Sequence, residues 1–351
     1  MKRFFQCLLA TFGLTTACGQ QNFETTDVRG FSLLTDNPNV VILDVRTASE
    51  YAEGHIEGAI HLDQGQSDFV EQAKAQLPSD KTIAVYCKRG RRSASAAERL
   101  AAVGYTCVSL NGGINAWKEA HMPLTTSTYR VDVFKTKSGK PLKIQALMHA
   151  SIRMQFDGKE IEIDPVTKLG NRTIDYTSMP KADYIFVTHE HADHYDPNAI
   201  ALLSAPHTRL VTNKRCADML SAGTVMNNGD KQQFGDLEVE AIPAYNTTEG
   251  HLQFHPKGRD NGYLLTIDGL RIYIAGDTED IPEMAELKDI DIAFLPCNQP
   301  YTMKPEQLIK AAKTIHPRVL FPYHSGQTDL SDIPAQLTPE GIDVRLRPDF
   351  Q

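Results

Sequence analysis

The feature that most constrains this chain of 351 residues is a cluster of histidines placed directly after a short apolar stretch. Residues 184–187 read Tyr-Ile-Phe-Val, and after one threonine residues 189–194 read His-Glu-His-Ala-Asp-His. Single histidines in a loop are usually surface residues. Here the apolar stretch predicts a buried strand that ends just before the cluster. Imidazole and carboxylate side chains gathered at such a position predict a metal site.

The spacing within the cluster suggests how metal would be held. In an extended segment residues i and i+2 point to the same side, so His189 and His191 can bind one ion. Asp193 and His194 lie where the chain turns and can face a second ion beside the first. The motif therefore predicts a site for two ions.

Two further side chains follow apolar runs in the same way. Asp277 comes after the run 271–274, and His324 comes after the run 319–321. A carboxylate at such a position can bridge two ions. Imidazole and carboxylate ligands without thiolate suit zinc, manganese or iron better than copper(I) or an iron–sulfur cluster. We expect two divalent ions, with zinc favoured and manganese as the alternative.

Residues from about 129 to 351 resemble the metallo-β-lactamase superfamily, and within it the branch of metal-dependent hydrolases that includes ascorbate-phosphate lactonases. Besides the histidine cluster, the resemblance rests on short segments at residues 149–151, 164–165, 254–258, 276–278 and 322–324. It implies an αββα sandwich with a dinuclear site. The implied ligands are His189, His191, Asp193, His194, His255, Asp277 and His324.

Within that set, the resemblance implies that His189, His191 and a third histidine hold the first ion. The third histidine is expected to be His255, with His251 as the alternative. Asp193, His194 and His324 would hold the second ion, and Asp277 would lie between the two. Asp164 is expected to be structural or to support a ligand, and His149 to line the pocket.

Two such ions lower the pKa of water, and the resulting hydroxide attacks an ester, lactone, amide or phosphodiester. The second ion stabilises the negative charge that develops on oxygen. Asp193 is expected to hold and receive the proton of the nucleophile. The motifs identify this chemistry and a small-molecule substrate, but they do not identify which substrate.

A second candidate site lies nearer the N-terminus, in a region of alternating strands and helices. Apolar runs at 40–43, 82–86 and 108–110 alternate with helical segments such as 93–103, a pattern typical of a parallel α/β sheet. The run 82–86 ends at Cys87, and the residues that follow it are Lys88, Arg89, Gly90, Arg91, Arg92 and Ser93. Amide groups and cations around one thiol favour the thiolate and can bind an anion.

Residues 27–123 resemble a single rhodanese (sulfurtransferase) domain. The resemblance rests on residues 44–46, 50–51, 54–60, 112–113 and 116–117, and on the Cys87 loop. It implies that Cys87 carries a persulfide taken from a sulfane-sulfur donor such as thiosulfate, while the loop and Arg92 hold the anionic donor. Arg92 stands in the shorter Cys-x4-Arg spacing, which favours sulfur transfer over phosphate hydrolysis. Asp44, Arg46 and His55 are expected to be architectural.

The first residues are typical of an exported bacterial protein. A positive start and the mostly apolar run 4–14 resemble a signal peptide, and Thr16-Ala17-Cys18 resembles a lipoprotein processing site. The sequence predicts a signal peptide over 1–18 with lipidation at Cys18, or else ordinary secretory cleavage near it. A tether over 19–26 and a linker over 124–128 complete the domain plan. The remaining cysteines show no Cys-x-x-Cys pair, and their disulfide state stays open.

The net charge of the chain makes some classes of binding partner unfavourable. The formal net charge is −8, which makes long-range attraction to nucleic acid or to an anionic lipid surface unfavourable. We expect no nucleic-acid partner, and contact with a membrane only through a lipid anchor at Cys18.

The combination of domains leaves three functional hypotheses. The first is a bifunctional exported enzyme, a metallohydrolase joined to a sulfurtransferase. The second is an iron-dependent persulfide dioxygenase coupled to the rhodanese domain, because such enzymes share the superfamily. The third makes the rhodanese domain a binding module whose Cys87 is not used.

Overall fold

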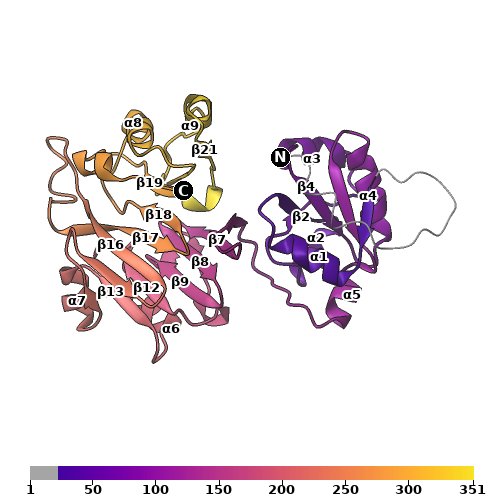
Figure 1. Cartoon of the computed structure of the whole chain (residues 1–351), viewed down its shortest axis with the longest axis horizontal. Helices are drawn as coiled ribbons and strands as arrows, with labels where there is room; N and C mark the ends of the chain where they lie inside the picture. Colours follow the sequence, from indigo (N-terminus) through magenta and orange to yellow (C-terminus); the bar gives the residue numbers. More distant parts are fainter. Residues whose placement is uncertain (1–22) are drawn as a thin grey trace. The chain divides into compact units, whose positions relative to one another are not determined.

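The computed structural model describes residues 23–351, and these form two compact units. The first comprises residues 23–35 and 39–126, and the second comprises residues 127–351 with 36–38 (Figure 1). The expected signal peptide, Cys18 and the first half of the expected tether, residues 19–22, lie outside the described residues. Within residues 23–351, none of the helices has the length and apolar character needed to cross a membrane.

The first unit is a five-stranded sheet in which every strand runs parallel to its neighbours, in the order β1-β5-β4-β2-β3. Its strands are β1 (Glu24–Thr26), β2 (Val40–Asp44), β3 (Ile60–His61), β4 (Thr82–Tyr86) and β5 (Thr106–Leu110). Its helices are α1 (Val28–Thr35), α2 (Ala48–Ala52), α3 (Phe69–Gln76), α4 (Arg91–Ala101) and α5 (Gly113–Glu119).

Successive side chains of β4 point to opposite faces of the sheet, and both faces are covered by helices. Ile83 and Val85 point into a core shared with α3 and α4, whereas Ala84 and Tyr86 point into a core shared with α1 and α5. A central parallel strand is buried on both sides, so its sequence is apolar throughout. The parallel α/β sheet predicted from the sequence is confirmed.

The expectation of a tether over residues 19–26 is wrong for its last three residues, which form a strand. Glu24, Thr25 and Thr26 form β1, which pairs in parallel with β5 at the edge of the sheet. Two β-branched threonines suit an edge strand, and the pairing adds hydrogen bonds that a free tether would lack. The first unit therefore begins before residue 27.

The second unit contains two seven-stranded sheets. The first has the order β14-β13-β12-β9-β8-β7-β6, and the second the order β15-β16-β17-β18-β19-β20-β21. Strands of the first are β6 (Val131–Lys135), β7 (Pro141–Met148), β8 (Ser151–Phe156), β9 (Lys159–Ile163), β12 (Tyr184–Val187), β13 (Arg209–Thr212) and β14 (Thr224–Val225). Strands of the second are β15 (Lys231–Phe234), β16 (Leu237–Ala244), β17 (Asp260–Ile267), β18 (Leu270–Ile274), β19 (Ile292–Pro296), β20 (Val319–Tyr323) and β21 (Asp343–Val344).

Each of these sheets opens with four antiparallel strands and continues with parallel ones. A separate hairpin is formed by β10 (Lys168–Leu169) and β11 (Arg172–Thr173). The helices of this unit are α6 (Pro197–Leu203), α7 (Lys214–Leu220), α8 (Pro305–Ile315) and α9 (Ile333–Leu337).

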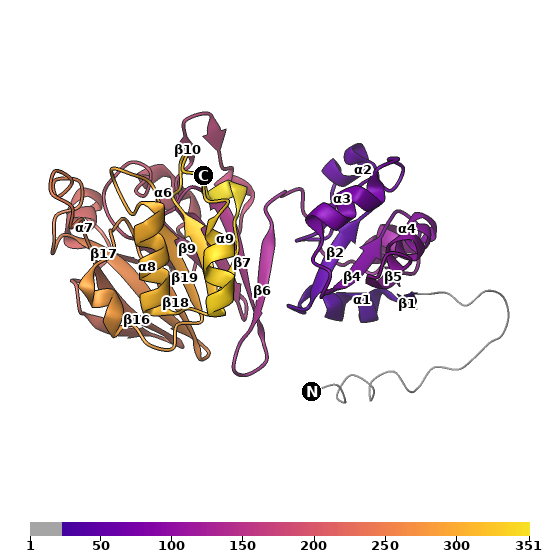
Figure 2. The same ribbon diagram turned by 90° about the horizontal axis from the view of Figure 1, so that it is seen from above.

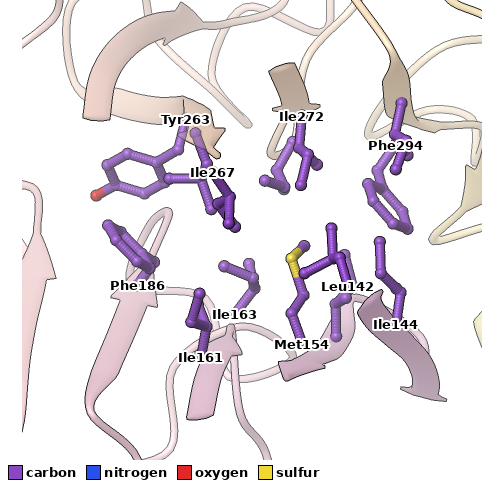
Figure 3. Packing of buried hydrophobic residues seen from close by; sticks show 14 of the residues in the cluster. Leu142, Ile144, Met154, Ile161, Ile163, Phe186, Tyr263, Ile267, Ile272 and Phe294 are labelled. Atoms are coloured by element: carbon purple, nitrogen blue, oxygen red, sulfur yellow. The ribbon is translucent and has the colours of Figure 1, made fainter. Parts of the chain in front are cut away.

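The main core of the second unit lies between its two sheets (Figure 3). Leu142, Met154 and Ile163 from the first sheet face Ile272 and Phe294 from the second. Each fully buried side chain of this kind contributes about 1.5–3 kcal/mol. Figure 2 shows α8 and α9 over the second sheet, where they form their own apolar cluster with it, while α6 and α7 pack on the outer face of the first. The expected αββα sandwich is confirmed.

Candidate functional site

Side chains from both sheets of the second unit meet beyond the ends of the strands. His189 and His191 follow β12, His255 lies in the loop between β16 and β17, and Asp277 follows β18. Their ligating atoms all lie within 4.8 Å of one another. Nε2 of His189 is 3.1 Å from Nδ1 of His191, and Nε2 of His255 is 3.4 Å from Oδ2 of Asp277. Two ligands of a tetrahedral zinc ion stand about 3.4 Å apart, so these spacings fit one ion.

A second group shares Asp277 with the first. The ligating atoms of His194, Asp277 and His324 also lie within 4.8 Å of one another. Oδ1 of Asp277 is 3.2 Å from Nε2 of His194, and its Oδ2 is 3.2 Å from Nε2 of His324. Oδ2 of Asp193 lies 3.2 Å from the same His324 nitrogen. Asp277 thus stands between two groups of ligands, in the position expected for a bridging carboxylate.

The structure brings together the seven residues expected as ligands. It places His251, the alternative third histidine, outside both groups of ligands. His251 has its Nδ1 3.4 Å from Oε1 of Glu279, and it belongs to neither group. The buried Glu279 carboxylate accepts hydrogen bonds from the backbone and hydroxyl groups of Thr247 and Thr248. These bonds anchor the start of the loop that carries His255.

Two carboxylates behind the cluster orient its histidines. Oδ2 of Asp164 lies 2.8 Å from Nδ1 of His194, and the same carboxylate accepts hydrogen bonds from the amide and hydroxyl of Thr188. Oδ2 of Asp260 lies 3.1 Å from Nδ1 of His255. Such carboxylates fix the rings so that Nε2 faces the metal. The position of Asp164 fits its expected supporting role, whereas Asp260 stands in no motif of the sequence and was not predicted.

Unsatisfied atoms provide a test of whether the cluster suits metal ions. Nε2 of His194, Nε2 of His255 and Oδ1 of Asp277 are buried and make no hydrogen bond. Leaving a buried polar atom unpaired costs about 1–3 kcal/mol. Three such atoms converging from different strands, with only nitrogen and oxygen ligands around them, fit divalent cations that prefer imidazole and carboxylate.

The electrostatics of the cluster agree with this fit. Burial and the positive charge of His194 hold the pKa of His189 well below its ordinary value, which leaves a neutral imidazole. Burial would raise the pKa of Asp277, but the charges of His324 and His194 outweigh it and keep that pKa well below its ordinary value. Neutral imidazole and ionised carboxylate are the forms that bind metal. Burial lowers the pKa of His194 and His324, but the charge of Asp277 outweighs it and raises the pKa of both, that of His324 to about 9. Metal cations would therefore displace the protons of these two rings when they bind.

His149, expected to line the pocket, lies against the second group of ligands. Its Nε2 is 3.3 Å from Oδ2 of Asp193, and its ring centre is 3.8 Å from that of His324. Its backbone takes a left-handed conformation with φ of 56°, and its amide donates to the carbonyl of Asp349. This long-range hydrogen bond, which no local pattern in the sequence indicates, places His149 beside Asp193.

The candidate sulfur-transfer loop lies at the C-terminal end of β4, as expected. Cys87 is only 1% exposed, while Lys88, Arg89 and Arg91 beside it are exposed. The amide of Ile114 donates to the carbonyl of Cys87. The start of α5 approaches the loop so closely that a Cβ at Gly113 would lie 2.3 Å from that carbonyl oxygen. Glycine is therefore required there, also because its φ is +61°.

Arg92 and Ser93 have partners within the fold. The Arg92 guanidinium donates two hydrogen bonds, of 2.7 and 2.8 Å, to the Glu50 carboxylate. The hydroxyl of Ser93 donates to the carbonyl of Gly90 and accepts a hydrogen bond from Ser109. Lys88, Arg89 and Arg91 are exposed, and Arg92 keeps 32% of its side chain exposed. No local pattern in the sequence indicates the pairing with Glu50, because it joins residues 42 positions apart.

The residues expected to be architectural are buried and bonded within the first unit. Arg46 donates to both oxygens of Asp44 and to the carbonyl of Gly54. His55 stacks on Tyr51 with ring centres 3.7 Å apart. Among residues 23–351, all four cysteines are buried and none forms a disulfide.

Comparison with known proteins agrees with both units. Residues 143–324 match the β-lactamase superfamily domain, and residues 29–120 match the rhodanese-like domain. The chain is 32% identical over 223 residues to a UPF0173 metal-dependent hydrolase of Geobacillus thermodenitrificans. This alignment covers 59% of this chain and 97% of that relative. A relative of the same description from Ligilactobacillus salivarius is 33% identical over 189 residues, or 52% of this chain and 84% of the relative.

Solved structures give the same result. A crystal structure from Parabacteroides distasonis, provisionally named a metal-dependent hydrolase, is 50% identical with a TM-score of 0.61, and the alignment covers 64% of this chain and 100% of that one. A metallo hydrolase from the archaeon Ignicoccus hospitalis is 26% identical with a TM-score of 0.51, covering 60% of this chain and 96% of that one. The chain therefore belongs to the β-lactamase superfamily, as a UPF0173-type metal-dependent hydrolase that also carries a rhodanese-like domain.

Proposed function

We propose that the second unit hydrolyses a small-molecule ester, lactone, amide or phosphodiester with two divalent metal ions, zinc or manganese. The observation that carries this proposal is the position of Asp277, whose carboxylate lies within reach of both groups of histidines. Its Oδ2 is 3.4 Å from Nε2 of His255 and 3.2 Å from Nε2 of His324, and its Oδ1 is 3.2 Å from Nε2 of His194. His189, His191 and His255 would hold the first ion. Asp193, His194 and His324 would hold the second, and Asp277 would bridge them.

When bound, the two ions supply hydroxide near neutral pH by lowering the pKa of water, and they stabilise negative charge on oxygen. The protein supplies the geometry. Asp164 and Asp260 hold the rings of His194 and His255, so these ligands need no rearrangement. Asp193 is the most exposed acid of the cluster, with 29% of its side chain accessible. Its carboxylate, held by His149 and His324, is placed to accept the proton released by the nucleophile.

Metal content and turnover measured together test this proposal. Protein purified without added metal should contain about two zinc or manganese ions per chain and hydrolyse 4-nitrophenyl esters or phosphodiesters. His189→Ala should lose one ion and Asp277→Ala should lose both, each with at least a hundredfold loss of kcat/KM. His207→Ala, an exposed histidine outside both groups, is the matched control and should change neither. Retained metal and turnover in His189→Ala and Asp277→Ala would refute the assignment.

The same measurement separates the hydrolase from the iron-dependent dioxygenase. One iron per chain, with oxygen consumed on addition of glutathione persulfide, would replace the hydrolase proposal. Three nitrogen or oxygen ligands on either side of Asp277, with Asp277 shared between them, support two ions, and so favour hydrolysis.

For the first unit we propose sulfur transfer through a persulfide on Cys87. The thiol attacks the outer sulfur of thiosulfate, and sulfite leaves with the electron pair of the broken S–S bond. Exposed Lys88, Arg89 and Arg91 would attract the anionic donor, while Arg92 is held beside the loop by Glu50. Export and lipidation at Cys18 remain proposals from the sequence, which metabolic labelling with a fatty acid would test.

A further inference from the structure

A group of large apolar side chains lies beside the proposed metal cluster. Tyr301 is 45% exposed, and its ring centre is 5.0 Å from that of Phe254 in an edge-on contact. Phe254 is half-buried and directly precedes His255. Leu252, which is 51% exposed, belongs to the same loop between β16 and β17. Leu252, Phe254 and Tyr301 together form the apolar surface of this region, and exposed apolar patches mark binding sites.

The order of strands in the second sheet places Tyr301 between two of the proposed metal ligands. β18, β19 and β20 run parallel to one another and lie side by side in that order. Their C-terminal ends therefore meet at one edge of the sheet. Asp277 follows β18 and His324 follows β20, so the loop of Tyr301, which follows β19, lies between them.

Hydrogen bonds and close packing attach the loop of Tyr301 to the loops on both sides of it. The side-chain amide of Asn246 donates to the carbonyl of Tyr301 at 2.8 Å, while the backbone amide of Asn246 donates to the carbonyl of His255. On the other side, a Cβ at Gly326 in the loop after β20 would lie 3.1 Å from Nδ2 of Asn298, in the loop of Tyr301. The apolar surface is thus fixed to loops that carry ligands of both groups.

The charges around this surface favour an uncharged ligand. Residues 247–254 contain no lysine or arginine, and Glu249 among them is exposed. The carboxylate of Glu279 accepts hydrogen bonds from Thr247 and Thr248 at the start of the same loop. These carboxylates would repel an anionic group, whereas an alkyl chain or an aromatic ring gains free energy by leaving water.

We infer that the apolar surface binds an uncharged apolar group of the substrate, an alkyl chain or an aromatic ring attached to the ester, lactone or amide that is hydrolysed. This inference rests on the proposed hydrolase function and narrows its substrate class. Tyr301 and Phe254 determine specificity, because they contact a part of the substrate that does not react. Aromatic side chains suit this role, since they offer a large apolar area and edge-on or stacked contacts to another ring.

Esters that differ only in the length of the acyl chain test the inference. For 4-nitrophenyl acetate, butanoate and octanoate, kcat/KM of the wild type should rise with chain length. Tyr301→Ala should lower the ratio of kcat/KM for the octanoate to that for the acetate about tenfold, and Tyr301→Phe should restore it. Met219→Ala is the matched control, because Met219 is 55% exposed on α7, outside the apolar surface, and it should leave the ratio unchanged.

Two results of this series would overturn the inference. One is an equal loss of kcat/KM for all three esters in Tyr301→Ala, which would show a structural role for the tyrosine. The other is a preference for the octanoate that arises only above the concentration at which this ester aggregates, which would indicate adsorption to a lipid-like surface.

Binding of 1-octanol and ethanol, followed by calorimetry, provides a measurement that does not depend on turnover. 1-Octanol should bind the wild type more tightly than ethanol, and Tyr301→Ala should remove the difference. Absent 1-octanol binding, with all three esters hydrolysed equally well, would overturn the inference and leave the hydrolase proposal intact. Absent metal and absent turnover, with 1-octanol binding retained, would instead overturn the hydrolase proposal and leave the apolar surface as a ligand site.

Discussion

Glu50 is the ion-pair partner of Arg92 in the Cys87 loop. Its two hydrogen bonds to Arg92 and those from Thr47 lower its pKa from 4.5 to about 2. The ionised carboxylate compensates the charge of the Arg92 guanidinium, whereas Lys88, Arg89 and Arg91 are exposed. An acid whose pKa is lowered by folding stabilises the folded state above its ordinary pKa, and this contribution is lost as the pH falls towards the lowered value.

We therefore expect the stabilisation by Glu50 to depend on pH. Glu50→Gln should lower the melting temperature of the rhodanese unit at pH 7, and the difference from wild type should shrink as the pH falls from about 4.5 towards 2, because the wild-type acid then becomes neutral. Differential scanning calorimetry of the full chain measures both melting temperatures. Glu53→Gln, an exposed acid next to the same short helix, should show no such trend. A constant difference across the acid range would contradict this role.

At the residue scale, the sequence predicts the ligands better than the residues that support them. The histidine cluster follows an apolar strand, and Asp277 and His324 follow strands as well, so local patterns were sufficient to select them. Asp260 and His149 act through contacts set by tertiary structure. Asp260 is the first residue of β17, five residues after His255, and His149 is positioned by the backbone of Asp349, 200 residues away.

At the scale of elements, the segment 348–350 supports the second group of ligands. Phe350 is 1% exposed and packs edge-on against Phe294, Phe321 and Tyr323. Its carbonyl accepts a hydrogen bond from the amide of Ser325, next to His324, while the preceding carbonyl accepts from His149. A short 3-10 turn thereby fixes two loops of the cluster.

Phe350→Ala should reduce metal binding as well as stability. Removing a buried phenylalanine from a core costs about 3–5 kcal/mol. The loss of the packing should also release the loops of His149 and His324, so we expect metal content to fall from two ions towards one. Phe134→Ala is the control, because Phe134 is buried in the same core but lies on β6, away from the cluster. Equal loss of metal in both variants would show that general destabilisation causes it.

Some strands, like some site residues, can be predicted from local sequence, and others cannot. Strands with continuous apolar runs, such as β4, β12 and β18, agree with the sequence to within a residue or two. The short strands at the sheet edges, β1, β14 and β21, have two or three residues each and were not predicted. Two or three residues carry no periodicity, and such strands form because a neighbouring strand offers unpaired hydrogen-bonding groups.

At the scale of the whole molecule, each unit has its own core and its own chemistry. The first unit has two apolar clusters around one sheet, and the second has a core between two sheets and clusters under its helices. Because the proposed catalytic residues of each unit come only from that unit, we expect two activities that can be removed separately.

Cys87→Ser should abolish the cyanolysis of thiosulfate and leave metal content and ester hydrolysis unchanged. Asp277→Ala should have the opposite effect, because neither residue belongs to the core of the other unit. Rhodanese and esterase assays on the same preparations compare the two directly. Equal cyanolysis by wild type and Cys87→Ser would identify the first unit as a binding module. Loss of both activities in either variant would indicate that the units depend on each other.

The ligands of the proposed dinuclear site come from two different sheets, and this has a consequence for assembly. His189, His191 and His194 extend from one sheet, and Asp277 and His324 from the other. Ions held between them would act as cross-links that fasten the two layers at one rim, in addition to the apolar contacts between their faces. Chelators should then act on this unit as mild denaturants, loosening the layers where catalysis takes place while the opposite rim stays closed.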